Sequence, residues 1–423
     1  MSHWFTWLTL GTQLSAYYVW YRLLCWDLRL FYQHSLRLLR DKNILFTKIF
    51  QSLSDNGRID MSPELRGELR CYNANASYTE DEIDYETIDA VETEYGVHVD
   101  RRVVNSGMIA LIFHCTKPGE EDQENNAVLK LKRRRITEHL HEGCASVAFL
   151  YGLAAYWFPR NIYIRVLRPF MTNLDDIIEQ CNFDHEIRNT REAKEDYAEL
   201  EFIKIPTVYN RADATENAFI LMERIRGTHT LPAETPEEDR IRYFQQLSLF
   251  TAYSIISNAM QHTDLHAGNI LFMPTGLGII DFGMALRLSN ESHDILLTIA
   301  DIVRGEESID TIDPCETFRH LFDPVLRVQD ITDIPRFRAI CRQIVNPLTE
   351  HAEVNELNLA DQLEELSASL NQEIALNQDF YKLVLSVTMT HGEVLILGNN
   401  YYDQARVHQI SKSCIQTACL MIM

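Results

Sequence analysis

The stretch MQHTDLHAGNILFMPTGLGIIDFGMALRL (260–288) decides the fold, and it holds two acid-containing sites on either side of a predicted β-hairpin. Asp264 is followed five residues later by Asn269, and Asp281 opens an Asp-Phe-Gly tripeptide after the second apolar run. In phosphoryl-transfer enzymes one aspartate orients the nucleophile or accepts its proton, while such an asparagine and a second aspartate hold magnesium. Magnesium is a hard cation that prefers oxygen ligands. A lone Asp-Phe-Gly usually marks a turn, but the whole set at this spacing predicts a metal-dependent phosphate site.

The composition limits the class of protein. A chain of 423 residues with 46% hydrophobic residues is long enough for two or three domains, or for one two-lobed unit with extensions. The 61 acidic residues outnumber the 39 basic ones, and the resulting charge of −22 disfavours binding to nucleic acid. The nine cysteines are scattered without a C-x-x-C pair, which is typical of reduced thiols in an intracellular protein. We therefore expect an intracellular protein with no nucleic-acid partner.

The N-terminal residues 4–40 are aromatic and nearly free of acids. Apolar residues recur every seven positions, which predicts one long helix with an apolar stripe. Two interpretations remain open. A membrane-spanning helix needs about 20 apolar residues, whereas this segment contains Gln13, Ser15 and Arg22. The stripe and the Trp and Tyr content favour a helix that packs on the protein or lies on a membrane surface.

A predicted hairpin at residues 98–131 carries a lysine inside an apolar strand, Ala127-Val-Leu-Lys130-Leu. Burying an unpaired lysine costs several kcal/mol, so Lys130 is expected to meet phosphate groups and a helix glutamate, for which Glu186 is the candidate. The alternative is an outward-facing lysine on an edge strand. The basic run that continues to Arg135 is expected to be mainly solvated.

The rest of the chain is predicted to be mainly helical. Residues 136–200 and 294–423 are assigned to helices, as is 239–260, while 205–209 and 218–223 are predicted strands. The predicted fold class is α+β: a two-lobed protein-kinase-like fold with a small β-rich N-lobe, a helical C-lobe and an N-terminal helical extension. The predicted domains are an aromatic amphipathic helix (1–45), a helical extension (46–97), the N-lobe (98–227) and the C-lobe (228–423).

Several motifs, in this order, resemble the UbiB-like (AarF-domain) atypical kinases. HTDLHAGN is similar to the H-x-D-P-H-P-G-N of that family, a motif that ordinary kinases lack. The resemblance covers about residues 45–290 and extends to THGEVLILGNN near the end. The other matching motifs are FTKIFQSLS with SPEL, SGMIA, AVLKLKRR, QCNFDHEIRN, IPTVY, FILMERIRG and IIDFGMALRL.

The resemblance implies an ATP site with magnesium. By position, Lys130 resembles the catalytic, nucleotide-binding lysine and Glu186 its partner on a helix. Asp264 resembles the catalytic aspartate, and Asn269 and Asp281 resemble the metal ligands, with Asn269 also in the catalytic loop.

The same resemblance places three residues in the nucleotide-binding loop, Asn105, Gly107 and Ala110, and Glu223 at the hinge. It also implies a link to prenyl-lipid metabolism of the coenzyme Q type, and partners that include ATP, lipids or lipid-biosynthesis proteins, and a membrane surface.

The segment that gates access to the substrate departs from the family pattern. Lys48 and Gln51 match the family's K-x-G-Q element, but Phe50 replaces its glycine, and a ring there would crowd a close backbone approach. The family's E-x-D becomes Gln180-Cys-Asn182, which removes both charges that Lys48 would meet. The alanine-rich nucleotide loop is reduced to Ser-Gly-Met-Ile-Ala.

These observations predict an atypical kinase or ATPase. One alternative is a nucleotide-binding scaffold with little turnover, which the altered gate favours. The other is a serine/threonine protein kinase with an unusual substrate. The segment after Gly283 lacks both A-P-E and a long Ser/Thr-rich loop, which argues against a conventional signalling kinase.

Overall fold

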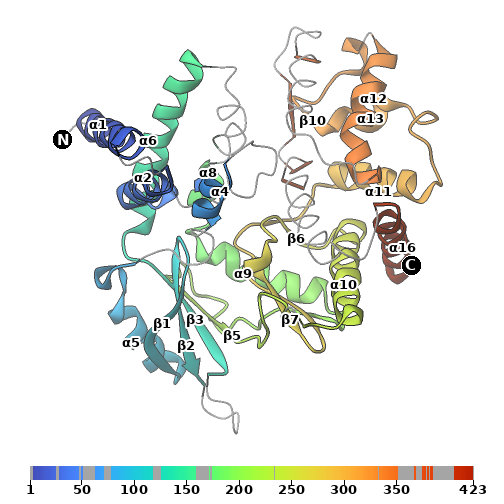
Figure 1. The fold of residues 1–423 in the computed structure, drawn as a ribbon. Coiled ribbons are helices and arrows are strands. Elements are labelled where there is room, and N and C mark those ends of the chain that lie inside the picture. The colour runs from blue at the N-terminus through green and yellow to red at the C-terminus, as the bar shows by residue number, and fades with distance from the viewer. Residues whose placement is uncertain are drawn as a thin grey trace. The chain divides into compact units, whose positions relative to one another are not determined.

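The structure is a computed structural model, and the chain divides into two compact units (Figure 1). Unit 1 comprises Met1–Asp184 and Tyr209–Arg224, and unit 2 comprises His185–Val208 and Ile225–Met423. The described residues are 3–24, 28–46, 49–50, 62–70, 78–117, 125–158, 171, 174–232, 234–331, 333–350, 366–367, 374–377, 379–380, 382–383 and 404–422.

A four-stranded antiparallel sheet of order β1-β2-β3-β5 forms the centre of unit 1. The predicted hairpin is confirmed, with Lys130 on β3 opposite Ile112 and Ile220. Side chains such as Leu111 and Leu129 are fully buried in a core that also takes in Ile88 of helix α5. The strands are β1 (His98–Ser106), β2 (Ala110–Thr116), β3 (Ala127–Lys132) and β5 (Phe219–Glu223), and the helices of unit 1 include η2 (Glu80–Glu82), α5 (Tyr85–Tyr95), α6 (Ile136–Trp157) and α8 (Leu174–Glu179).

The single long helix predicted for residues 4–40 is wrong. α1 (His3–Tyr18) and the π-helical η1 (Val19–Leu24) are followed by a separate helix, α2 (Leu28–Lys42). The rings of Tyr18 and Phe31 lie 5.5 Å apart, and those of Tyr21 and His34 are stacked at 5.2 Å, so the two helices fold against each other. The apolar residues that recur every seven positions therefore belong to a hairpin of two helices. Within the described part of the chain, no helix combines the length and apolarity needed to cross a membrane.

Phe50 is a core side chain of the N-terminal extension. It is buried in a cluster with Leu36 of α2 and Leu69 of α4 (Pro63–Arg70), and its ring lies 6.2 Å from that of Phe46. The ring thus has a packing role in this cluster, and the predicted crowding of the gate stays a prediction. The neighbouring gate residues Lys48 and Gln51 lie outside the described residues.

Unit 2 is built around helix α10 (Glu237–Ile256), whose buried residues join one large hydrophobic core. The predicted hairpin between Asn269 and Asp281 is confirmed as β7 (Ile270–Met273) and β8 (Gly276–Ile279), and Tyr243 of α10 donates a hydrogen bond of 2.8 Å to the carbonyl of Met273. Its catalytic role stays a prediction. The C-terminal helix α16 (Gln404–Ile422) lies along α10 (Figure 1). A second core contains residues of α11 (Asn290–Arg304), α12 (Pro314–Phe318), η4 (Arg319–Leu321), β10 (Phe322–Asp323) and α13 (Ile334–Glu350). Unit 2 also holds η5 (Val328–Asp330) and β11 (Ala375–Leu376), which pairs with β10.

The structure of residues 183–209 differs from the sequence prediction in two respects. Residues 185–208 are predicted to lie in the N-lobe, but helix α9 (Phe183–Asp196) runs into unit 2, where the Tyr197 ring lies 4.6 Å from that of Phe250. The strand predicted at 205–209 is wrong, because the strand β4 (Ile203–Lys204) comes earlier and pairs with β8. Pro206 has no backbone N–H to extend that ladder. The other domain boundaries stay predictions.

Gly276, at the turn of the catalytic hairpin, has a φ of +152°, and an added Cβ would lie 2.8 Å from the carbonyl carbon of Phe202 and collide with its oxygen. Gly276→Ala is therefore expected to lower the free energy of unfolding by about 1–3 kcal/mol. Gly152→Ala is the control, because nothing lies within 4 Å of its Cβ position in α6 and alanine favours a helix by about 1 kcal/mol. Urea denaturation measures both, and equal stability of the two variants would contradict the backbone contact.

Candidate functional site: a metal and phosphate site in unit 2, a lysine and loop in unit 1

The loop between β6 (Gln261–His262) and β7 turns so that Asp264 and Asn269 face each other across it. The Asn269 side-chain amide donates a hydrogen bond of 2.9 Å to the carbonyl of Asp264, and His266 N–H donates to the same oxygen at 3.0 Å. Gly268 N–H donates to Nδ1 of His266 at 3.0 Å and starts the 3₁₀ turn η3 (Ala267–Asn269). The nitrogen of the Asn269 amide is thus engaged by the loop, and its Oδ1 remains as the oxygen that a metal ion requires.

Asp281 has a φ of 65°, which is uncommon outside glycine. Its Oδ1 accepts a hydrogen bond of 3.3 Å from Gly283 N–H, and Ile280 N–H donates to the carbonyl of Asn269 at 3.1 Å. The left-handed backbone at Asp281 and the hydrogen bond to Asn269 fix two oxygen-bearing side chains at neighbouring ends of the paired strands β7 and β8. Strained backbone of this kind is concentrated at functional sites.

Phe282 and Glu186 complete the surroundings of Asp281. The Phe282 side chain is fully buried, and its carbonyl accepts a hydrogen bond of 3.0 Å from Asn189 of α9. The buried Glu186 on the same helix lies beside Gly283, with Oε2 3.3 Å from the position that a Cβ would occupy. Glu186 thus belongs to the Asp-Phe-Gly region of unit 2. Lys130 lies in unit 1, and the pairing of the two side chains stays a prediction.

His262 is a buried neutral side chain. Burial lowers the pKa of its imidazole, and the hydrogen bond to Ile280 only partly opposes this. Nε2 lies 3.1 Å from the carbonyl of Ile280, and Nδ1 accepts a hydrogen bond of 3.2 Å from Asp264 N–H. Those two contacts require one protonated and one unprotonated nitrogen, so the neutral ring ties the start of the catalytic loop to the strand before Asp281.

This burial predicts a pH dependence of stability. An unfolded histidine takes up a proton as the pH falls through about 6.5, whereas His262 in the fold does so only at lower pH. Stability is therefore fully present above pH 6.5 and is lost below it, by at most about 1.4 kcal/mol per pH unit from this residue. In urea denaturation between pH 7.5 and 5, His262→Asn should show a shallower slope than the wild type. Equal slopes would mean that His262 is not the residue responsible.

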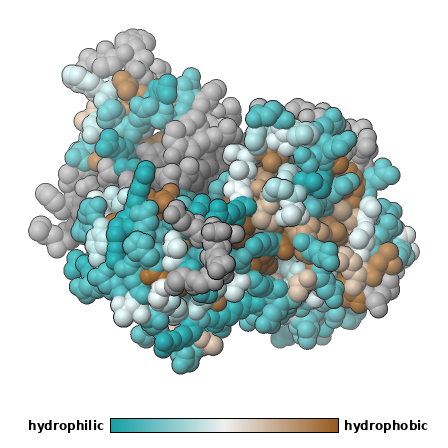
Figure 2. All heavy atoms as spheres, turned by 90° about the horizontal axis from the view of Figure 1, so that it is seen from below, coloured by the Kyte–Doolittle hydropathy of each residue, from teal (hydrophilic) through white to brown (hydrophobic). Residues whose placement is uncertain are grey.

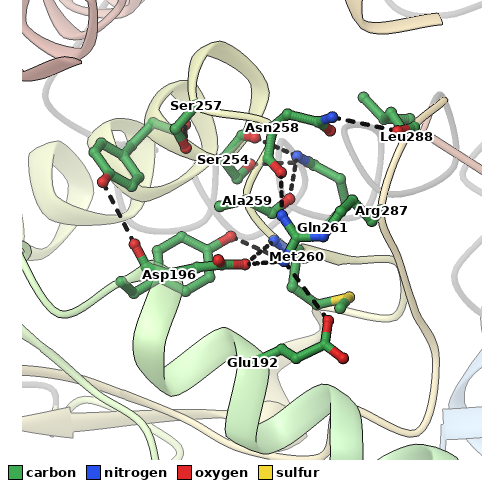
Figure 3. A network of polar contacts seen from close by, with 12 residues as sticks. Glu192, Asp196, Ser254, Ser257, Asn258, Ala259, Met260, Gln261, Arg287 and Leu288 are labelled. Carbon is green, nitrogen blue, oxygen red and sulfur yellow. Dashed lines mark hydrogen bonds and ion pairs between the residues drawn. The ribbon is translucent and has the colours of Figure 1, made fainter. Parts of the chain in front are cut away.

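Arg287 fixes the chain that follows Asp-Phe-Gly (Figure 3). Its guanidinium donates hydrogen bonds of 2.7 Å to a carboxylate oxygen of Asp196 and 2.6 Å to the carbonyl of Asn258. The same Asp196 oxygen accepts a hydrogen bond of 2.8 Å from Met260 N–H. Gln261 bridges Ser254 and Ala259 in this network. The end of α9, the start of the catalytic loop and the segment after β9 (Ala285–Leu286) are joined in one network. Sequence analysis missed these residues, because their partners are 29 and 91 positions away from Arg287.

Lys130 is buried in unit 1, with 8% of its surface exposed. Its Nζ lies 5.7 Å from the centre of the Phe183 ring, and Nζ of Lys132 lies 5.0 Å from the same ring. Burial lowers the pKa of Lys132, opposed by nearby Cys181 and Asp184. The expectation of a buried Lys130 is confirmed, and the outward-facing edge-strand alternative is wrong because β3 lies between β2 and β5.

The predicted nucleotide-binding loop is a tight connection between β1 and β2. Gly107 N–H donates a hydrogen bond of 2.9 Å to the carbonyl of Ala110, and Oδ1 of Asn105 accepts one of 2.7 Å from Ser106 N–H. Arg133 is expected among solvated basic residues, but it is 2% exposed and forms hydrogen bonds with this loop. Burial lowers the pKa of its guanidinium, and Glu82 opposes this.

One of the predicted gate residues has a local structural role. Oδ1 of Asn182 accepts a hydrogen bond of 3.2 Å from Asp184 N–H at the start of α9, which is the geometry of a helix N-cap. Gln180 is partly buried in the turn before it. Glu223 ends β5, one residue before the end of unit 1 at Arg224.

The residues present suit magnesium and ATP. Magnesium is typically bound by one or two carboxylates together with phosphate oxygens and water, and Asn269 and Asp281 provide two oxygen-bearing side chains of this kind. Among the described residues there is no group of three or more His, Cys, Asp or Glu side chains that would form a complete metal site.

A lysine on the third strand of a small antiparallel sheet, together with a catalytic hairpin that leads into Asp-Phe-Gly, defines a protein-kinase-like fold. The comparisons agree with this class. Residues 80–307, more than half of the chain, match the ABC1 atypical kinase-like domain. The chain belongs to this family, which is the UbiB/AarF family of atypical kinases.

Among curated proteins no match was found. A solved structure that is similar to this chain is the complex of Rv3197 with erythromycin from Mycobacterium tuberculosis. It is 16% identical, with a TM-score of 0.46, and the likeness covers 78% of this chain and 82% of that chain.

Proposed function

We propose that the chain binds ATP with magnesium and uses it for phosphoryl transfer or ATP hydrolysis. The observation that carries the proposal is the fixed pair of Asn269 and Asp281, since the Asn269 amide nitrogen is held by Asp264 and its oxygen remains for a metal. Bound magnesium would neutralise phosphate charge. Asp264 would accept the proton of the attacking hydroxyl or water, and Lys130 would hold the phosphates.

A scaffold that binds nucleotide with little turnover is the second candidate. The uncharged Gln180 and Asn182 favour it, and Asn182 caps a helix instead of presenting a charge. A scaffold, however, has no chemical need for Asp264, Asn269 and Asp281 together. A protein kinase with an unusual substrate is less well supported, because α11 begins at Asn290, seven residues after Gly283.

The proposal includes a role near a membrane, in prenyl-lipid metabolism of the coenzyme Q type, within the cell. It is supported by an exposed aromatic end of α6, where Tyr156, Trp157 and Phe158 have 78%, 67% and 65% of their surface exposed. Residues 143–174 contain three arginines and no acid in a chain of charge −22. Trp and Tyr beside basic residues are typical of chains that lie at an anionic lipid surface. In the view of Figure 2, hydrophilic side chains predominate on the left, and hydrophobic ones are more frequent on the right.

The test is ATP turnover by the full chain with Mg²⁺, measured with and without vesicles of phosphatidylcholine that contain about 30% phosphatidylglycerol. The anionic lipid is included because it attracts basic segments. We expect turnover that rises with vesicles in the wild type. Tyr156→Ser/Trp157→Ser should lose the rise and keep the basal rate, whereas the exposed control Tyr78→Ser should keep both. A basal rate that vesicles do not change would contradict the lipid link, and no turnover with measurable ATP binding would favour the scaffold.

A further inference from the structure

Arg133 is buried at the end of β3, although the basic residues beside it are exposed. It is 2% exposed, whereas the side chain of its neighbour Arg134 is 45% exposed and pairs with Asp84 at 3.2 Å. A buried guanidinium costs several kcal/mol unless its N–H groups are matched by acceptors. Its acceptors therefore indicate what the side chain is there to hold.

Those acceptors lie on the nucleotide-binding loop. One terminal nitrogen of Arg133 donates two hydrogen bonds of 2.7 Å, one to Oγ of Ser106 and one to the carbonyl of Gly107. The backbone N–H of Arg133 donates 2.9 Å to the carbonyl of Ile109. Arg133 thus contacts both sides of the connection between β1 and β2, and it orients the peptide that follows Gly107.

The other terminal nitrogen of Arg133 ties the loop to the N-terminal side of the domain. It donates a hydrogen bond of 2.9 Å to Oε2 of Glu82, and this oxygen also accepts a hydrogen bond of 3.0 Å from Thr79 N–H. The carbonyl of Glu82 in turn accepts 2.9 Å from Arg134 N–H. The turn at residues 79–82 and the nucleotide-binding loop are therefore held in one arrangement by a single forked side chain, which a lysine cannot reproduce.

We propose that Arg133, held by Glu82, is a positioning residue that sets the shape of the loop 106–110 and thereby the affinity for the phosphates of a nucleotide. This inference rests on the proposed ATP binding. In kinases the corresponding loop covers the phosphates, while the nucleoside is held elsewhere. A loop that has lost its support should therefore weaken binding of ATP and leave binding of adenosine unchanged.

The experiment is isothermal titration calorimetry of the full chain with Mg-ATP and with adenosine, below the melting temperature of each variant. For Arg133→Met, which keeps the length of the side chain, we expect the Kd for ATP to rise about tenfold or more, equivalent to about 1.4 kcal/mol. Arg133→Lys and Glu82→Gln should show a smaller rise in the same direction. The control Arg134→Met changes the adjacent surface arginine and should stay within about twofold of the wild type.

Two results would overturn the inference. One is an ATP Kd for Arg133→Met within twofold of the wild type, and the other is an equal loss of ATP and adenosine binding, which would show general destabilisation. If Arg133→Met does not fold, Glu82→Gln decides, because the Glu82 side chain is partly exposed and the change affects only its contacts with Arg133 and Thr79 N–H. Absence of ATP binding in the wild type would instead refute the proposed function, so the two failures are distinguishable.

Discussion

Asp281→Asn is expected to lower the Mg²⁺-dependent turnover of ATP by at least about 10²–10³-fold, as the loss of one preorganised electrostatic group commonly does. The substitution removes the negative charge from the oxygen pair that it forms with Asn269. It keeps the size of the side chain and an oxygen that can still accept from Gly283 N–H. The fold should therefore survive, so the loss of rate reports on the metal. The measurement is phosphate release as a function of Mg²⁺ concentration.

Asp264→Asn should give a loss of similar size through a different step, because the proton of the attacking group then has no acceptor. The Asp264 carbonyl that holds Asn269 is backbone and is unchanged by the substitution. The Mg²⁺ dependence of turnover by Asp264→Asn should thus resemble that of the wild type, which distinguishes this variant from Asp281→Asn. Asp239→Asn on the surface of α10 is the control and should retain the wild-type rate. Turnover that neither change affects would show that the activity belongs to a contaminant.

Lys130→Ala is expected to weaken ATP binding by about 2–3 kcal/mol, or roughly a hundredfold in Kd. Lys130 is nearly fully buried on the inner strand β3, where contact with an anion offsets the cost of burying an ammonium group. In the proposed function the phosphates of the nucleotide make such a contact. The measurement is calorimetric titration with Mg-ATP.

Lys132→Ala is the matched control for Lys130. The two lysines are two positions apart on β3 and both ammonium groups lie near the ring of Phe183. Removing Lys132 therefore reproduces the lost contact with the ring and the change in net charge. An equal effect of both substitutions would mean that Lys130 has no special role towards ATP, and equal, absent binding in the wild type and Lys130→Ala would refute ATP binding.

The catalytic stretch could be predicted from the sequence because its geometry is local. Asp264 and Asn269 are joined by a hydrogen bond within one loop, and the hairpin that leads to Asp281 has its turn at Pro274 and Thr275. Such short spacings leave few backbone arrangements. The buried Lys130 could be predicted because it stands inside an apolar strand, although alternation with Leu129 and Leu131 places its side chain on the opposite face of the sheet.

Features that depend on distant partners could not be predicted in the same way. The heptad stripe of residues 4–40 is equally compatible with one helix or with two that fold together, and the choice depends on contacts such as Tyr18 with Phe31. The Arg287–Asp196 pair joins residues 91 positions apart and has no local signal. Arg133 did have one, because alternation along β3 continues from Leu129 and Leu131 to the same buried side.

Phe50 shows how a departure from a family pattern is explained by packing. From the motif alone, a phenylalanine in place of glycine indicated a blocked approach above the site. The side chain instead fills a hydrophobic cluster with α2 and α4. Asn182 is similar, since an uncharged residue replaces an acid at a helix N-cap. Neither change removes the oxygen atoms on Asn269 and Asp281, so both are compatible with ATP chemistry.

The central claim is tested most directly by a crystal structure of the full chain with Mg²⁺ and a non-hydrolysable ATP analogue. The account predicts a magnesium ion bonded to Oδ1 of Asn269 and to the carboxylate of Asp281, at the roughly 2.1 Å typical of magnesium. It also predicts Nζ of Lys130 in contact with a phosphate oxygen. A nucleotide bound away from these three residues, or a metal ion that touches neither Asn269 nor Asp281, would contradict the account.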